Sequence, residues 1–493
     1  MEFDKDLLAI QEARDMAAKA AVACQELAKL SDEQIDAITK AMAVAGEEHA
    51  RELAEMAHEE TKYGKVEDKV YKNHMATGML YEAIKDMKCS GIIAEDPELK
   101  TVTMAYPVGP VMGITPTTNP TSTVMFKSII AVKAKNPIVF SPHPRALQSS
   151  LAAAKLMMDA AKSAGAPDNV VQMLSVASME GSNALMHDDN IKLIIATGGP
   201  GMVKAAYSAG KPAIGVGAGN SPTYIEKTAN VKEAVHQIMV SKTFDNSTVC
   251  ATEQSVICEK CNEAEVIAEF KAQGAYFMSE EETKKVCGVI FKGGHNMNAE
   301  YVAQPALKIA KDAGISVPDS TLVLIGRQDG VGPAYPLSYE KLTTVLAFYT
   351  VEDWQEACEL SKKLLQNGIG HTMNIHTEDR EMALKFMEKP ASRILVNTGG
   401  AMGGTGASTG LFPSFTLGCG TMGGSSVSEN VSPMHLTNKK VLCWGIKDVD
   451  TLVSGDEIYQ KYQGKGCPSC GKNVEITSEE LKCVIDAVIQ ALR

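Results

Sequence analysis

A cysteine lies where the sequence changes from polar to apolar residues in the stretch Phe244–Ile257, FDNSTVCATEQSVI. Small polar residues precede Cys250, and an apolar segment typical of a β-strand follows it. A free cysteine is most often a small buried hydrophobe. Polar neighbours and a following strand can instead expose a thiolate beside backbone N–H donors, as nucleophilic catalysis requires. We therefore predict that Cys250 is a nucleophile, and we interpret as structural the thiols of Cys24, Cys89, Cys287, Cys358 and Cys419.

Two turns could serve such a nucleophile. Asn119 lies in TPTTNPTST, between an expected strand and an expected helix. Its amide could hold its own turn or could donate to the oxyanion of a tetrahedral intermediate, and the residues alone leave both open. Thr197, Gly198 and Gly199 form the turn in IKLIIATGGPGMVKAAYSAG, where the free N–H groups of a helix start favour phosphate. This turn is not the G-x-G-x-x-G fingerprint and is not specific by itself.

The elements that must position these residues alternate along the chain. The first ~90 residues have helical periodicity, and from residue 107 to 226 short apolar segments alternate with helical ones. This alternation predicts a parallel α/β sheet covered on both faces, and a second α/β stretch follows over 227–436. We expect strands over 100–107, 108–116, 136–142, 170–176, 191–198 and 212–217, and helices over 121–134, 145–165, 182–188 and 200–210.

Bulk composition narrows the class of protein. With 493 residues, 45% of them hydrophobic, the chain can bury a large core, and its length suggests two or three domains. The formal charge of −12 argues against a nucleic-acid-binding protein, which needs a basic face. We find no run of ~18 apolar residues and no signal sequence, so we expect no membrane partner. The 12 cysteines are too sparse for a disulfide scaffold, which indicates reduced thiols and a cytoplasmic protein.

Eight stretches in a fixed order carry a resemblance that no one of them would carry alone. They are PVGPVMGITPTTNPTSTVMFKSIIAVKAKNPIVFSPHPRA, TGGPGMVKAA, GVGAGNSPTYI, FDNSTVCATEQSVI, KLTTVLAFY, GIGHT, RILVNTGG and FPSFTLGCGTMGGSSVSEN. Together they resemble the aldehyde dehydrogenase superfamily, and in particular its coenzyme A-acylating branch. The resemblance extends from near the N-terminus to about residue 440.

The resemblance implies an α/β aldehyde dehydrogenase fold. It has a Rossmann-like cofactor domain, an α/β catalytic domain and strands that pair across subunits in a homodimer or homotetramer. The implied segments are 1–90 and 107–227 for the NAD-binding domain, 228–437 for the catalytic domain, 91–106 and 438–446 for the oligomerisation strands, and 447–493 for a linker and a C-terminal helix.

The resemblance also implies roles for individual residues. Cys250 would attack the aldehyde carbonyl, and Asn119 with the Cys250 backbone N–H would form the oxyanion hole. Hydride transfer to a nicotinamide would then leave a thioester on Cys250. The cofactor-binding positions would be Thr197, Gly198 and Gly199 near the pyrophosphate, Ser141, Pro142 and His143 at the adenosine end, and Glu340 at the nicotinamide ribose.

The resemblance implies NAD as the cofactor, with NADP as an alternative. No acidic residue follows the strand in NPIVFSPHPRA, and His143 and Arg145 could tolerate a 2′-phosphate. The substrate would be a short-chain aldehyde such as acetaldehyde or propionaldehyde. We find no cluster of Arg or Lys near the motifs that would indicate succinate semialdehyde, and we assign Arg393 to the fold.

One position separates acyl transfer from hydrolysis. Hydrolytic members carry a glutamate in E-L-G-G-K that activates water, whereas this chain has Val216 in VGAGN. Loss of a general base costs water attack a factor of ~10²–10⁴, while a thiolate needs less help. The valine therefore favours transfer to coenzyme A. The alternatives are a free carboxylate as product with another base such as Glu253, a cysteine acyltransferase without redox chemistry, and an inactive assembly protein.

The C-terminal tail beyond the matching motifs raises two separate questions. Residues 477–493 begin with a capping box and carry one apolar stripe, which predicts an amphipathic helix. It could pack on its own subunit, or it could dock on shell proteins, since it resembles the encapsulation peptides of bacterial microcompartments. The pair CPSC, 467–470, has metal-ligand spacing, but a zinc site needs two more ligands and only CEKC, 258–261, could supply them. We therefore expect no metal.

Overall fold

The computed structural model describes residues 4–447 and Lys482. The chain divides into two compact units, Met1–Gly91 with Ala105–Lys439 and Ile92–Met104 with Lys440–Arg493. The predicted amphipathic helix 477–493, apart from Lys482, and the CPSC pair lie outside the described residues. Within residues 4–447 no helix is long and apolar enough to cross a membrane.

A five-stranded parallel sheet follows the N-terminal helices, as the alternating pattern predicts. Its order is β5-β4-β3-β6-β7, so the chain leaves the central strand β3 first to one side and later to the other. Such a reversal opens a crevice at the carboxyl ends of the strands, where α/β proteins bind ligands. The strands are β3 (Val111–Ile114), β4 (Ile138–Ser141), β5 (Val171–Met173), β6 (Leu193–Thr197) and β7 (Ala213–Val216).

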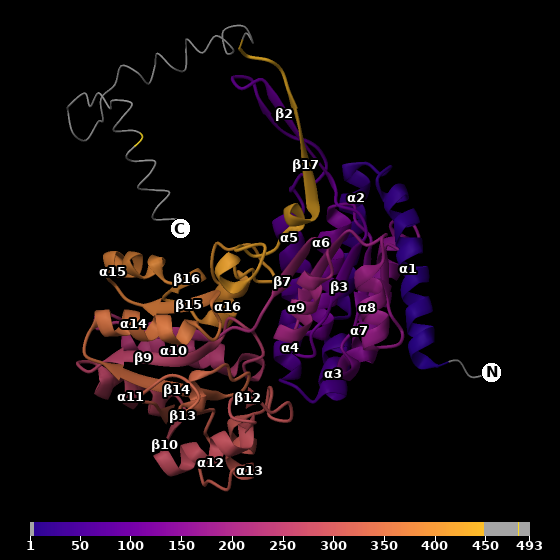
Figure 1. Ribbon diagram of the computed structural model, residues 1–493. Helices are drawn as coiled ribbons and strands as arrows, with labels where there is room; N and C mark the ends of the chain where they lie inside the picture. The colour runs from indigo at the N-terminus through magenta and orange to yellow at the C-terminus, as the bar shows by residue number, and fades with distance from the viewer. Residues whose placement is uncertain (1–3, 448–481, 483–493) are drawn as a thin grey trace. The chain divides into compact units, whose positions relative to one another are not determined.

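Helices cover both faces of this sheet because its strands are apolar on both sides. One face packs against α2, α6 and α7, and the other packs against α1, α8 and α9 (Figure 1). The helix α1 lies close along α8, since a Cβ on Gly181 would lie 2.9 Å from Ala9 Cβ. The helices are α1 (Lys5–Leu27), α2 (Asp32–Glu48), α3 (Ala50–Thr61), α4 (Val66–His74), α5 (Leu80–Ile84), α6 (Pro120–Lys133), α7 (Leu147–Ser163), α8 (Met179–His187) and α9 (Pro200–Ser208).

A seven-stranded parallel sheet carries the second half of the chain, in the order β10-β13-β14-β9-β8-β15-β16. The strand β9, which directly follows the Cys250 turn, lies in its middle. The strands are β8 (Ser221–Ile225), β9 (Glu253–Glu259), β10 (Ala275–Met278), β13 (Val323–Arg327), β14 (Val345–Val351), β15 (Gly370–His376) and β16 (Ala391–Val396). A separate hairpin pairs β11 (Phe291–Lys292) with β12 (Asn296–Met297).

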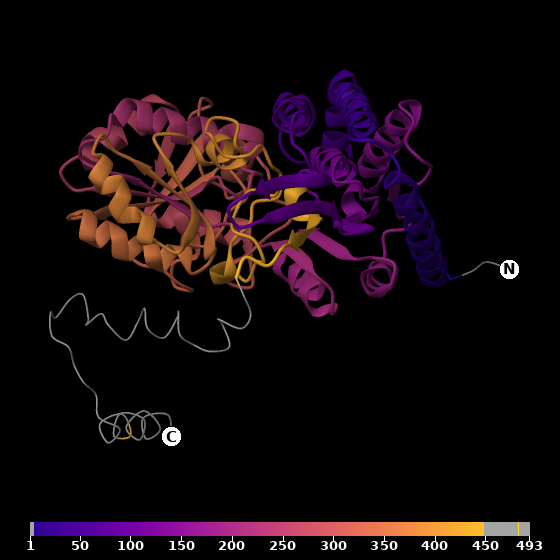
Figure 2. The ribbon, with the colours of Figure 1, turned by 90° about the horizontal axis from the view of Figure 1, so that it is seen from above.

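Helices cover both faces of the larger sheet as well, as the view from above shows (Figure 2). They are α10 (Val231–Thr243), α11 (Glu263–Ala272), α12 (Glu280–Ile290), α13 (Ala306–Asp312), α14 (Trp354–Leu365), α15 (Arg380–Lys385) and α16 (Gly400–Thr405). The strand β8 corrects one expected boundary. It lies inside the predicted segment 107–227 but pairs with β9 and β15, so the two sheets separate between Val216 and Ser221.

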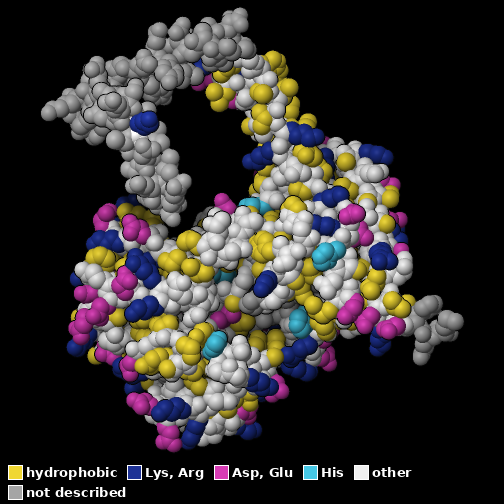
Figure 3. Space-filling view, viewed as in Figure 1, with side chains coloured by type: hydrophobic (Ala, Val, Ile, Leu, Met, Phe, Trp, Pro, Cys, Tyr) yellow, Lys and Arg dark blue, Asp and Glu magenta, His cyan; other side chains and the backbone are white. Residues whose placement is uncertain are grey.

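The described part of the second unit belongs to a three-stranded sheet of order β1-β2-β17. Its strands are β1 (Gly91–Asp96), β2 (Thr101–Pro107) and β17 (Thr437–Cys443). Large apolar side chains gather on this unit in the space-filling view (Figure 3), and those exposed to solvent include Ile92, Leu99, Met104, Val441, Leu442, Trp444 and Ile446. A sheet this small that leaves so many apolar side chains exposed is typical of a surface that another protein covers.

Candidate active site

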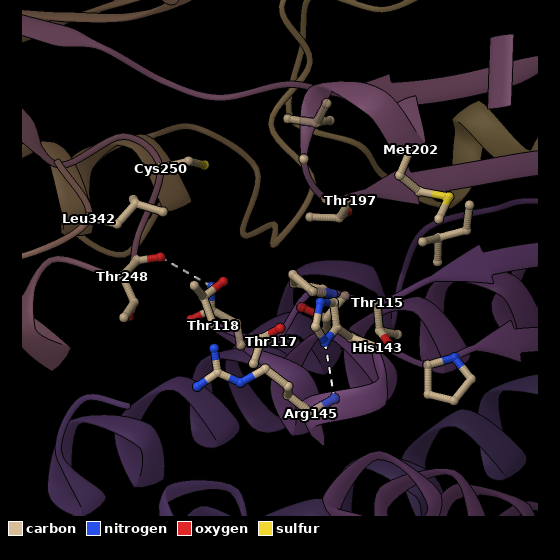
Figure 4. A pocket seen from close by; sticks show the side chains of 18 of the residues that line it. Thr115, Thr117, Thr118, His143, Arg145, Thr197, Met202, Thr248, Cys250 and Leu342 are labelled. Carbon is tan, nitrogen blue, oxygen red and sulfur yellow. Dashed lines mark hydrogen bonds between the residues drawn. The ribbon is translucent and has the colours of Figure 1, made fainter. Parts of the chain in front are cut away.

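One cavity of about 710 Å³ in the first unit is lined by every predicted site residue. Cys250, Thr248 and Leu342 lie at one end of it, and Thr197, Met202, Thr115 and His143 lie at the other (Figure 4). We call these the thiol end and the strand-terminal end. The residues predicted from sequence thus share one cavity, although they come from both sheets.

The strand-terminal end consists of turns that follow the parallel strands. Thr197 ends β6, and Gly198 and Gly199 lead into α9, whose N-terminus has no side-chain cap. A Cβ on Gly199 would meet no atom within 4 Å, so this part of the turn faces open space. The hydroxyl of Thr197 is buried and finds no hydrogen-bond partner among the described residues. Free N–H groups at a helix start together with an unpaired hydroxyl form a site suited to an anionic phosphate.

The neighbouring turn after β4 is held by side chains. Ser141 Oγ and Ser182 Oγ share a hydrogen bond of 2.7 Å. His143 Nδ1 accepts a hydrogen bond of 3.1 Å from the backbone N–H of Arg145, drawn as a dashed line in Figure 4. Arg145 Nη1 donates to Tyr63 Oη at 2.9 Å, and its guanidinium lies 5.0 Å from the centre of the Tyr63 ring. Burial, with the charge of Arg145, lowers the pKa of His143.

At the thiol end, Cys250 is half-buried in the turn before β9. The backbone N–H of Thr252 closes this turn on the carbonyl of Val249 at 3.0 Å. A Cβ on Gly219 would lie 2.0 Å from the Cys250 carbonyl oxygen, so only glycine permits this approach. Burial raises the pKa of the Cys250 thiol to about 12, and the carboxylate of Glu340 contributes to the shift.

Asn119 lies at the start of α6 and contacts the loop that carries Cys250. It occupies the N-cap position of α6, yet its side chain makes no capping hydrogen bond. Its Nδ2 donates to the carbonyl of Thr248 at 3.3 Å, shown dashed in Figure 4, and to Thr118 Oγ1 at 3.1 Å. Its Oδ1 accepts from Lys72 Nζ at 2.7 Å. One amide N–H is therefore directed toward the loop that carries the thiol, and the amide oxygen, the atom that could cap α6, accepts from Lys72 instead.

Three residues bear on whether the cavity contains a general base: Val216, Glu340 and Glu253. Val216 lines the cavity, and among the described lining residues Glu340 is the only acidic one. Burial raises the pKa of Glu340 to about 7, and its Oε1 accepts from the backbone N–H of Gly219 at 2.9 Å. Glu253 is fully buried, does not line the cavity, and accepts through Oε1 from Asn374 and from the Gly400 backbone. The alternative that Glu253 activates water is therefore wrong.

Two groups beside the site were not identified from sequence. His371, in the GIGHT stretch, is buried, and burial together with Arg393 lowers its pKa to about 3, so it is neutral. A Cβ on Gly219 would lie 3.3 Å from His371 Nδ1, which places the ring behind the Cys250 carbonyl. The other group is Lys72, whose partner Asn119 is 47 residues away. The motif containing His371 was a usable signal, whereas nothing local marks Lys72.

The described part of the chain contains no candidate metal-binding site. Among residues 4–447 and 482, no group of three or more His, Cys, Asp and Glu side chains could hold an ion. The CEKC pair is split, because Cys258 is buried and contacts the Tyr349 carbonyl while Cys261 is exposed and contacts Glu259. The predicted partner pair CPSC lies outside the described residues.

The family model and the similar proteins found by comparison all point to aldehyde dehydrogenases. The aldehyde dehydrogenase family matches residues 8–297. The bifunctional aldehyde-alcohol dehydrogenase of Escherichia coli (strain K12) is 48% identical over 425 residues, which are 85% of this chain and 48% of that protein. The chain therefore spans about half the length of the curated relatives it matches first.

Solved structures match over almost their full length. An acetylating aldehyde dehydrogenase from Geobacillus thermoglucosidasius has a TM-score of 0.89 and 47% identity, covering 91% of this chain and 99% of that one. A propionaldehyde dehydrogenase from Rhodopseudomonas palustris, solved with bound CoA and an acylated cysteine, has a TM-score of 0.77 and 26% identity over 90% of this chain and 97% of that one.

Proposed function

The chain belongs to the aldehyde dehydrogenase family, and from this premise we propose that it oxidises a short-chain aldehyde to an acyl-coenzyme A while reducing NAD. The Cys250 sulfur forms a bond to the carbonyl carbon, and the carbonyl oxygen becomes an oxyanion. Bound NAD would supply the acceptor for the hydride of this carbon, and Cys250 would then hold the acyl group as a thioester. The thiol of coenzyme A then takes the acyl group, and Cys250 is regenerated. The reaction is proposed to be reversible: coenzyme A and Cys250 exchange one thioester for another, and the same hydride can pass between the substrate carbon and the nicotinamide in either direction.

Oxyanion stabilisation is the proposed role of Asn119 and the Cys250 backbone N–H. The Asn119 amide lies at the cavity wall with its N–H groups turned toward the Thr248–Cys250 loop. A preorganised donor of this kind contributes a rate factor of ~10²–10³ in acyl-transfer enzymes. In this structure the two Nδ2 hydrogens donate to the Thr248 carbonyl and to Thr118 Oγ1, so stabilising the oxyanion would require one of them to exchange that acceptor for the oxyanion.

Nucleotide binding is the proposed role of the strand-terminal end. The unpaired hydroxyl of Thr197 and the uncapped start of α9 suit a pyrophosphate. Ser141, Pro142 and His143 would contact the adenosine, and Glu340 would accept from a ribose hydroxyl. We propose NAD as the preferred cofactor on the basis of the family, and NADP as an accepted one, because no carboxylate at this end of the described lining would repel a 2′-phosphate.

The observation that carries the choice of coenzyme A over water is the lining at Val216. A valine cannot take a proton, and the one acidic residue of the described lining, Glu340, is the proposed acceptor for the nicotinamide ribose. Water attack on the thioester thus lacks a free base, while a thiol does not depend on one to the same degree. The competing function is a dehydrogenase that releases a free carboxylate.

A pre-steady-state experiment distinguishes the two functions. Purified protein is mixed with NAD and propionaldehyde, NADH absorbance is followed, and coenzyme A is added midway. We expect a burst of about one NADH per active site, then almost no turnover, and sustained NADH formation only after coenzyme A. Free turnover without coenzyme A would contradict the proposal, and so would the absence of any burst.

The substrate class follows from the charges around the thiol end. The only Lys or Arg side chain in the described lining is Arg145, and its guanidinium is engaged with Tyr63. Arg393 is buried and donates to Asn430 and to the carbonyl of His371. These hydrogen bonds assign it to the structure around the site and not to the substrate. We therefore propose an uncharged short aldehyde such as acetaldehyde or propionaldehyde; the alternative, succinate semialdehyde, would place a carboxylate without a partner.

Assembly is a separate part of the proposal. Exposed apolar side chains on the sheet β1-β2-β17 support pairing with another copy of the chain, as a homodimer or homotetramer. Light scattering of wild type and of Leu442→Glu tests this, because the variant should dissociate. Docking of residues 477–493 on a microcompartment shell is tested by deleting 474–493, which should keep activity and abolish co-sedimentation with shell proteins.

A further inference from the structure

A buried lysine on α4 makes three contacts beside the thiol end. Lys72 Nζ donates to Asn119 Oδ1 at 2.7 Å, to Asp245 Oδ2 at 2.6 Å and to Thr248 Oγ1 at 2.5 Å. Its side chain is 2% exposed. An ammonium group has three N–H donors and no acceptor, so each donor has one partner and the group is fully used.

This contact determines which way the Asn119 amide points. Because Lys72 can only donate, it must meet the oxygen of the amide and never its nitrogen. The Nδ2 of Asn119 is thereby turned to the opposite side, toward Thr248 and the loop that carries Cys250. Without Lys72 the amide could rotate by half a turn and present an oxygen to the oxyanion.

The second partner of Lys72 holds the loop before the nucleophile. Asp245, Asn246 and Ser247 have φ values of 46°, 50° and 70°, a left-handed conformation that non-glycine residues adopt only when their surroundings impose it. Lys69 Nζ also reaches Asp245 Oδ2, at 3.0 Å, and the backbone N–H of Lys65 donates to Asp245 Oδ1 at 2.7 Å. One face of α4 therefore clamps the loop.

The close approach of the two segments requires a glycine. A Cβ on Gly64 would lie 1.7 Å from Asp245 Oδ1, and Gly64 has a φ of 70°. Burial by itself would raise the pKa of Asp245, but the ammonium groups of Lys69 and Lys72 outweigh it, so the carboxyl is ionised. Two ammonium groups then face one carboxylate, and the buried cluster holds a positive charge beside the oxygen of Asn119.

We infer that Lys72 is a positioning residue for the oxyanion hole, acting through Asn119 by fixing and polarising its amide while it holds the Asp245 loop. This inference rests on the proposed aldehyde oxidation. It assigns a role in the reaction to α4, a helix whose residues lie outside every motif that carries the family resemblance. A positive charge at the amide oxygen strengthens the amide N–H as a donor to a developing negative charge.

The test compares two reactions of the same thiol. Oxidation of propionaldehyde requires an oxyanion hole, whereas alkylation of Cys250 by iodoacetamide requires only the thiolate. We expect Lys72→Met to slow the NADH burst about tenfold to a hundredfold, part of the ~10²–10³ that an oxyanion donor contributes, and to change alkylation less than twofold. An equal fall of both rates would mean that Lys72 serves the fold alone and would overturn the inference.

A double-mutant cycle checks that Lys72 acts through Asn119. If it does, Lys72→Met has no further effect on the burst in an Asn119→Ala background, because coupled residues are not additive. Multiplying effects would contradict the inference. The matched variant is Lys69→Met, which loses contacts to Asp245 and to the Thr118 carbonyl but none to Asn119; its burst should fall less than that of Lys72→Met.

The wild-type protein provides a measurement that does not depend on a variant folding. Burial lowers the pKa of Lys72 to about 8, with Lys69 lowering it and Asp245 and Asp68 raising it. The ratio of burst rate to alkylation rate cancels the titration of Cys250, so we expect this ratio to fall severalfold above pH 8 as Lys72 loses its proton. A constant ratio from pH 7 to 10 would count against the inference. Absence of any burst in the wild type would instead overturn the proposed function.

Discussion

The two ends of the cavity are built by different means. At the strand-terminal end, Thr197, Gly198 and Gly199 present backbone groups that follow directly from a parallel strand and the helix after it. At the thiol end, Asn119 and the Asp245 loop are held by charged side chains that arrive from α4. Burying charges is costly unless they are paired. The difference indicates that the backbone groups of the turn between β6 and α9 follow from topology, while the position of Asn119 and of the Asp245 loop depends on paired buried charges.

The largest effect is expected from a change of the side chain at Val216, which lines the cavity and ends β7. Val216→Glu should raise turnover in the absence of coenzyme A by ~10²–10⁴, the range that a general base provides. The reason is that water could then attack the thioester on Cys250. Steady-state NADH formation without coenzyme A measures it.

Val216→Gln is the matched control for that substitution. The glutamine side chain has the same size and polarity but cannot take a proton at neutral pH. Its turnover without coenzyme A should stay at the wild-type level. If both variants gained equally, the effect would come from an enlarged or wetter cavity, and the absence of a base would not explain acyl transfer.

The same contrast explains what the sequence could predict. The turn at Thr197–Gly199 was recognisable because strand, turn and helix are adjacent in sequence, and parallel pairing then brings the carboxyl ends of β3, β4 and β6 together. The α/β fold was confirmed for the same reason. The boundary after residue 227 was wrong because β8 follows β7 with no helix between them, so the periodicity gives no sign that the chain has entered the second sheet.

The support of the thiol end could not be predicted. Lys72 lies 173 residues from Asp245 and 47 from Asn119, within a helical segment where a lysine normally indicates a solvated face. The left-handed conformation of Asp245–Ser247 is imposed by those contacts and leaves no local signal in FDNS. Burial of Glu253 likewise depends on Asn374 and Gly400, which come from distant parts of the chain.

A smaller effect should come from the charge of Glu340. Its carboxylate raises the pKa of the Cys250 thiol, after the larger contribution of burial. Glu340→Gln should therefore lower that pKa, increase the thiolate fraction at pH 8 and speed alkylation by iodoacetamide about three- to tenfold, since one unit of pKa is a factor of ten. The KM for NAD should rise in the same variant, because the proposed ribose acceptor is weakened.

The effect of Glu340 on the alkylation rate should depend on pH. The pKa of Glu340 is raised to about 7, so its carboxyl is neutral below that pH and charged above it. Wild type and Glu340→Gln should then be alkylated at equal rates below pH 7 and should diverge above it. Glu359→Gln, an exposed carboxylate on α14, is the control and should match wild type throughout. Divergence that persists at pH 5 would contradict an electrostatic cause.

The smallest expected effect concerns Arg145 at the strand-terminal end. Its guanidinium is exposed, donates to Tyr63 and lines the cavity beside His143. If it tolerates a 2′-phosphate, Arg145→Leu should raise the KM for NADP about two- to fivefold and leave that for NAD nearly unchanged, since an exposed charge contributes at most ~1 kcal/mol. The control Arg51→Leu removes an exposed arginine that does not line the cavity.

Screening at ~1 M salt, where the Debye length is about 3 Å, should erase the effect at Arg145, whereas the effects of Val216→Glu and of Lys72→Met should persist. An Arg145 effect that survived high salt would mean that the strand-terminal end also relies on a buried network, and the contrast between the two ends would then fail.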